Sequence, residues 1–144
     1  MSAHRIDVLG SGVAGLVDRV EPAQVSRAGL ILTVTALDTA AVPTDGVITA
    51  VLTDWRANRP IGPVHQLSIG SMRARLDGAA LSAGQAGRMT DYRAEFGRAR
   101  AIAALEFGIS GRGREGLREL VCEACAATDS TDLIANVLRD HIRG

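Results

Sequence analysis

A glycine-spaced stretch near the start of the chain constrains its fold more than any other feature. Ile6 and Val8 form an alternating apolar pattern, and Gly10, Gly12 and Gly15 then follow in G-x-G-x-x-G spacing. This arrangement is typical of a buried parallel strand that enters a helix through a tight glycine turn. Because a central strand must be paired and covered on both faces, we predict an α/β fold.

The rest of the chain has enough strand-like and helix-like segments to complete such a fold. Strands are predicted where β-branched and apolar residues run together, at residues 30–37 and 64–69, with a fourth strand or a hairpin over 72–81 around Asp77-Gly78. Helices are predicted where apolar residues recur every three to four positions, at residues 16–20, 47–55, 90–107, 117–125 and 130–142. The expected architecture is a small, largely parallel sheet of three or four strands with flanking helices and a C-terminal group of about three helices.

Length and composition predict a single domain covering residues 1–144, with a sheet-containing part at 1–81 and a helical part at 82–144. A hydrophobic fraction of 47% is enough for a core. Since aromatic residues make up only 3% of the chain, that core must consist mainly of alanine, valine, leucine and isoleucine.

The charged residues exclude several functions. All 16 basic residues are arginine, which excludes a Schiff-base lysine and a Walker-type phosphate-binding lysine. A formal net charge of zero argues against nucleic acid as a partner. No apolar run approaches the roughly 20 residues of a membrane span, and the chain starts without a signal-peptide pattern. We therefore expect a cytoplasmic protein with no membrane partner.

The glycine turn resembles the dinucleotide-binding fingerprint of Rossmann proteins over eleven residues of the chain. The resemblance implies a small ligand with a phosphate or carboxylate, a nucleotide cofactor among them, bound by Gly10, Ser11, Gly12 and Gly15. It also implies that Asp38, after the second strand, binds a ribose. Asp38 lies 28 residues beyond Gly10, whereas the fingerprint places its acidic residue after about 20. The alternative is a tight structural turn that binds nothing.

Cys122 and Cys125 form a C-x-x-C pair within a predicted helix. Two thiols on one helical turn can share a metal ion or exchange as a redox dithiol. A zinc site needs two further ligands, for which His141 is the nearby candidate. We therefore predict no metal site, and we expect buried, unreactive thiols.

No nucleophile stands beside a base in the sequence, so the sequence leaves open whether the protein is an enzyme. His65, in the third predicted strand, is the candidate residue for proton transfer. A hydrogen-bonded structural histidine is the alternative interpretation of that position.

Charge is unevenly distributed along the chain. Residues 72–114 carry eight arginines against four acidic residues, a net charge of +4, and residues 115–144 carry three against six, a net charge of −3. Opposed segments of this kind favour a homo-oligomer or a protein partner. The sequence thus suggests two functions: a small-ligand-binding domain with its ligand at the Gly10–Gly15 turn, or a non-catalytic assembly subunit, a homo-oligomer or part of a larger complex, that uses its C-terminal helices.

Overall fold

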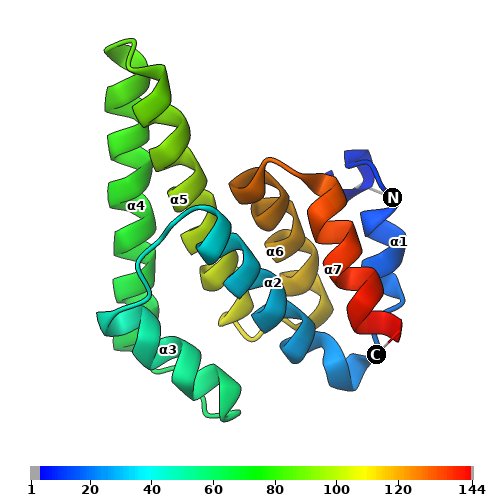
Figure 1. The fold of residues 1–144 in the computed structure, drawn as a ribbon. Coiled ribbons are helices and arrows are strands. Elements are labelled where there is room, and N and C mark those ends of the chain that lie inside the picture. Colours follow the sequence, from blue (N-terminus) through cyan, green and yellow to red (C-terminus); the bar gives the residue numbers. More distant parts are fainter. Residues whose placement is uncertain (1–3, 144) are drawn as a thin grey trace.

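The computed structural model describes residues 4–143, and every regular element within them is a helix. In chain order these are the 3-10 helix η1 (Arg5–Val8), α1 (Val13–Asp18), the 3-10 helix η2 (Pro22–Gln24), α2 (Val25–Thr39), α3 (Gly46–Arg56), α4 (Pro63–Gln85), α5 (Met89–Gly108), α6 (Gly113–Thr128) and α7 (Thr131–Arg143). The predicted α/β fold is therefore wrong, and the chain is a helical bundle (Figure 1).

Helix α6 lies at the centre of the bundle. Helices α5 and α2 pack against it on one side, and α7 and α1 cover it on the other (Figure 1). The buried apolar residues of α6 follow helical spacing: Leu117, Leu120, Val121, Ala124 and Cys125. Buried alanines of α5 take the place of aromatic residues in the core, as the composition predicts: Ala99, Ala101, Ala103 and Ala104.

Helix α2 occupies the segment predicted as the second strand. Its buried residues form a helical stripe: Ala28, Gly29, Leu32, Thr33, Ala36 and Leu37. Two threonines outside this stripe form hydrogen bonds within the helix itself. The hydroxyl of Thr35 donates to the carbonyl of Ile31 (2.9 Å), and that of Thr39 donates to the carbonyl of Thr35 (2.8 Å). Packing against α5 and α6 thus outweighs the β propensity of residues 30–37.

Helix α4 runs without a break through two features predicted as strands. One is the strand at 64–69, and the other is the hairpin at Asp77-Gly78. The carboxylate of Asp77 accepts hydrogen bonds from Arg100 of α5 (2.7 Å) and from Arg73 one turn earlier (3.3 Å). Because these ion pairs hold Asp77 within a helix, the Asp-Gly dipeptide makes no turn.

Four of the predicted helices are confirmed. They are α3, α5, α6 and α7, which correspond to the predictions at 47–55, 90–107, 117–125 and 130–142. The predicted boundary between residues 81 and 82 falls inside α4.

Helices α4 and α5 form a long hairpin at one side of the bundle, joined through residues 86–88. The connected end of this hairpin projects beyond the other helices, and α3 lies near the opposite end of α4 (Figure 1). As a result, α4 is the outermost helix and has one long side that does not face the bundle.

Candidate functional site

The glycine turn predicted as a ligand site is a structural turn. Residues 6–8 belong to the short helix η1 and no strand precedes the turn, while Ser11 and Gly12 have left-handed φ angles of 62° and 69°. The Ser11 hydroxyl donates to the carboxylate of Asp132 in α7, and Arg139 donates to the Ser11 carbonyl (3.0 Å). Since α7 binds this corner and the helix that follows has only six residues, the predicted ligand-binding function at Gly10–Gly15 is not supported.

The other predicted site residues lie on separate helices. Asp38 is exposed in the last turn of α2, and His65 is half-buried in the first turn of α4. Gly10, Ser11, Gly12 and Gly15 belong to the corner between η1 and α1. The structure therefore keeps the four turn residues together and gives Asp38 no strand end from which to reach them.

Both cysteines of the C-x-x-C pair are free and buried in α6. Burial raises the pKa of the Cys122 thiol to about 11, and it also raises the pKa of Cys125. At neutral pH both side chains are therefore protonated thiols, which are poor nucleophiles and poor metal ligands.

One group of side chains in the described residues has the composition of a metal site, namely His4, Glu115 and Glu119. The Nδ1 atom of His4 accepts a hydrogen bond from the amide of Ile6 (3.0 Å), so the ring proton lies on Nε2, which faces Glu119 at 2.5 Å. Arg5 binds the other oxygen of Glu119 (2.6 Å). A metal ion would have to displace the Nε2 proton of His4 and the Arg5 side chain that binds Glu119. We therefore interpret this group as an ion-pair cluster.

The same cluster continues into the core as a chain of ion pairs. The buried carboxylate of Glu123 accepts hydrogen bonds from Arg5 (2.9 Å) and Arg100 (2.8 Å), and Arg100 also binds Asp77 of α4. Burial of Glu119 opposes its ionisation, but the hydrogen bonds and charge of Arg5, with those of His4, hold the pKa of Glu119 below its ordinary value. These contacts join η1, α6, α5 and α4, and their chemistry is structural.

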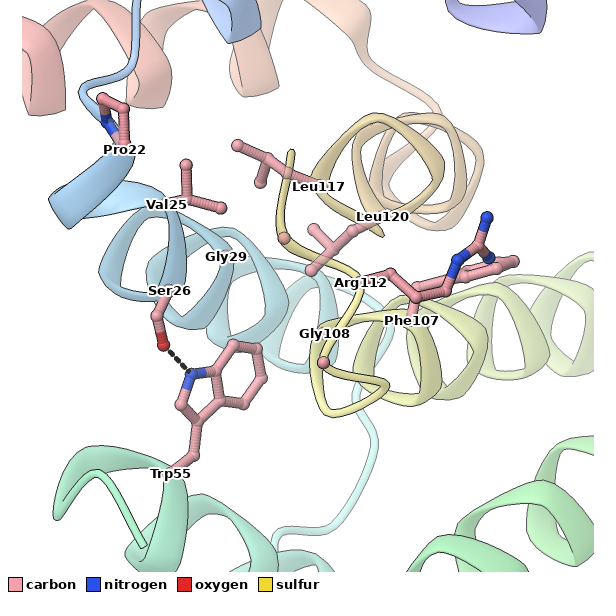
Figure 2. A pocket seen from close by; sticks show the side chains of 12 residues that line it. Pro22, Val25, Ser26, Gly29, Trp55, Phe107, Gly108, Arg112, Leu117 and Leu120 are labelled. Atoms are coloured by element: carbon pink, nitrogen blue, oxygen red, sulfur yellow. Dashed lines mark hydrogen bonds between the residues drawn. The ribbon is translucent and has the colours of Figure 1, made fainter. Parts of the chain in front are cut away.

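A half-open cavity of about 300 Å³ lies between α2, α3, the loop after α5 and α6 (Figure 2). The indole N–H of Trp55 donates to the hydroxyl of Ser26 (2.9 Å), which fixes the indole as one wall. Gly108 is required there, because a Cβ atom on it would overlap the Trp55 ring. The guanidinium of Arg112 lies 5.9 Å from the ring centre of Phe107, and Figure 2 shows both side chains extending away from Trp55.

The second feature is the side of α4 that faces away from the bundle, here called the outer face of α4. It consists of seven exposed residues spaced alternately three and four positions apart: Val64, Leu67, Ser71, Ala74, Gly78, Leu81 and Gln85. Val64 and Leu67 are each 73% exposed and Leu81 is 61% exposed. None of the helices within residues 4–143 is long and apolar enough to cross a membrane.

The charged residues of α4 mostly face the other way. Arg73 binds Glu106 of α5 (2.6 Å), and Asp77 binds Arg100 of α5. Arg75 is the one charged residue among the exposed positions of α4. A solvated helix normally places its charges outward and its apolar residues inward, so α4 has the opposite arrangement.

The outer face of α4 borders an apolar groove between α3 and α4. Two adjoining hollows of about 370 and 470 Å³ form it, and they share Met72 and Arg75. Its other apolar residues include Val42, Pro43, Val47, Ile48, Val64 and Leu67. Sequence reasoning missed both the groove and the outer face, although the three-four spacing from Val64 to Gln85 was the signal that could have shown them.

The fold and these surfaces define the chain as an all-helical bundle domain. Compared with protein-family models, with curated proteins and with solved structures, the chain gives no match. Assembly through the C-terminal helices is also not supported, because nine of the 16 residues of α6, which lies between α5 and α7 in the chain, are buried within the bundle.

Proposed function

We propose that this protein self-associates, with two copies pairing through the outer face of α4. The observation that carries the proposal is the inverted arrangement of α4, whose ion pairs point to α5 while valine and leucine point to solvent. Large exposed apolar side chains on the face of one helix, beside an apolar groove, are typical of interaction sites in soluble domains. The face carries almost no charge, so it favours a partner surface that is also apolar and uncharged. A second copy of the same face is such a surface.

The order of residues along the outer face makes it complementary to itself. When two copies lie antiparallel with Ser71 of one beside Ala74 of the other, Leu67 falls beside Gly78 and Val64 beside Leu81, because each pair is equally distant from the centre. Small residues then meet at the centre and a leucine packs over a glycine on each side. Such a pattern lets helices approach closely.

The size of the face predicts the strength of the association. Helix α4 has 23 residues, which corresponds to about 34 Å of length. A single helix face of that length offers less area than the roughly 800 Å² per partner of a standard interface. We therefore expect a reversible dimer with a dissociation constant on the order of micromolar.

Sedimentation equilibrium over a wide concentration range tests the proposal. The wild-type chain should change from monomer to dimer as concentration rises, and the Leu67→Glu variant should stay monomeric because it places a carboxylate in the seam. Val8→Glu is the matched control: Val8 is an apolar residue of η1 that is 85% exposed and lies away from α4, so this variant should dimerise normally.

A wild-type chain that stays monomeric at every concentration would refute the proposal, as would a Leu67→Glu variant that dimerises as well as wild type. Circular dichroism of each variant should show unchanged helix content, since both substituted positions are exposed in one copy.

A further inference from the structure

We infer that the hollow between α3 and the first half of α4 is a socket for Leu81 of a second copy. This inference rests on the proposed pairing and extends it to α3, because Val47 of α3 forms one wall of the hollow. The hollow has a volume of about 470 Å³, and Leu81 is 61% exposed. Since Leu81 lies about 25 Å beyond Val64 along the same helix, a copy cannot fill its own hollow with it.

The residues of α4 that line the hollow have the spacing of a helix-packing hole. They occupy positions i, i+3, i+4 and i+7: Val64, Leu67, Ser68 and Ser71. In knobs-into-holes packing, four such residues of one helix surround a single side chain of the helix that faces it. The small Ser68 leaves the middle of this hole open, so a branched apolar side chain can enter without displacing a neighbour.

The register of the proposed pair brings Leu81 to this hole. In that register Leu81 of one copy lies beside Val64 of the other. A helical side chain leans towards the N-terminus of its own helix, which in an antiparallel pair is towards the C-terminus of the helix that faces it. Leu81 therefore leans from Val64 towards Leu67, over the hole. Ser71 and Ala74 define the register, whereas the hollow has no part in defining it, so the two agree independently.

The socket also suits the charge and the size of the contact. Of the described residues that line the hollow, Arg75 is the one that carries a charge, and it is exposed. Its aliphatic stem can cover a leucine while its guanidinium stays in water. Because the pair is symmetric, each dimer has two sockets, and they add surface of α3 to a helix face that alone is smaller than a standard interface.

An exchange of side-chain volume between Leu81 and Ser68, followed by sedimentation equilibrium, tests the inference. Leu81→Ala should raise the dissociation constant of the dimer about a hundredfold, or about tenfold for each of the two buried leucines. Ser68→Leu fills the socket from within one copy and should raise the constant about tenfold or more. The variant with both substitutions should associate at least about tenfold more tightly than the two separate effects combined predict, because the leucine at 68 replaces the one removed at 81.

Ala94→Leu at an exposed position of α5 and Leu133→Ala on α7, where Leu133 is 36% exposed, are the matched controls and should dimerise as wild type does. Circular dichroism should show that every variant is folded. A wild-type dimer that Ser68→Leu or Leu81→Ala leaves unchanged, or in which the two effects simply add, would overturn the socket while the proposed pairing stands. A wild-type chain that stays monomeric at every concentration would refute both.

Discussion

Helices α6 and α4 both pair inward-facing charges, but they place their apolar residues on opposite sides. In α6 the apolar residues face the core, and the buried carboxylate of Glu123 is bound by Arg5 and Arg100. In α4 the ion-paired residues Arg73 and Asp77 face α5, while the apolar residues face solvent. The buried residues of α6 are therefore paired or packed within one copy, whereas the outer face of α4 is the surface that the proposed pairing of two copies would cover.

The largest expected difference between the two helices comes from replacing one leucine of each with alanine. Leu120 of α6 is 1% exposed, so Leu120→Ala should lower the free energy of unfolding by about 3 kcal/mol through lost burial and a cavity. Leu67→Ala should lower it by less than about 0.5 kcal/mol in the monomer. Urea denaturation at low protein concentration measures both, and equal losses would mean that the outer face packs within one copy.

The second test removes the buried charge of α6. Glu123→Gln keeps the shape of the side chain but leaves Arg5 and Arg100 without their shared carboxylate. We expect a loss of about 2 kcal/mol in unfolding free energy, less than for a fully buried pair because Arg5 is half exposed. The control is Asp91→Asn in the exposed Arg88–Asp91 pair, which should cost less than about 0.5 kcal/mol. A similar cost for both variants would show that Glu123 has no special role.

The third test separates the stability of α4 from its role in association. In one copy nothing lies within 4 Å of a Cβ atom added to Gly78, so Gly78→Ala should stabilise the monomer by about 0.5 to 1 kcal/mol through helix propensity. Gly78→Gln should keep the helix but weaken the dimer, because its longer side chain meets Leu67 of the second copy. Unchanged sedimentation of the Gln variant would argue against this register.

The smallest expected effect is a pH dependence at the edge of α6. The pKa of Glu119 lies below its ordinary value of 4.5 in the folded chain, so its ion pairs stabilise the fold above that value. This stabilisation should be lost as pH falls through 4.5 towards the lowered pKa. Melting temperatures should therefore fall less steeply with acidification in Glu119→Gln than in wild type, while exposed Glu21→Gln should follow wild type.

The sequence predicts some helices of this bundle and not others for a definite reason. Segments with one clean apolar stripe, such as α6 and α7, were recognised by their periodicity. Residues 30–37 are apolar on nearly every side, and an apolar run of that length fits a buried strand as well as a buried helix. Only the packing of α2 against α5 and α6 decides between them.

The candidate sites depend on contacts that are distant in the sequence. Ser11 meets Asp132 and Arg139, which lie 121 and 128 positions further along, and these contacts make the glycine turn structural. In α4 the local preference of the Asp77-Gly78 dipeptide for a turn is outweighed by the contact between Asp77 and Arg100 of α5. The local pattern therefore predicted correctly that residues 10–15 form a turn, but it could not show that side chains of α7 bind that turn.

Cysteine crosslinking between two variants tests the central claim most directly. In the proposed antiparallel pair, residue 67 of one copy lies beside residue 78 of the other, whereas the two copies of residue 67 are about 16 Å apart along the helix. Chains with Leu67→Cys mixed with chains with Gly78→Cys should form a disulfide-linked dimer under mild oxidation, and Leu67→Cys alone should not; the native cysteines are buried. No crosslink in the mixture, or an equally efficient one in Leu67→Cys alone, would contradict the account.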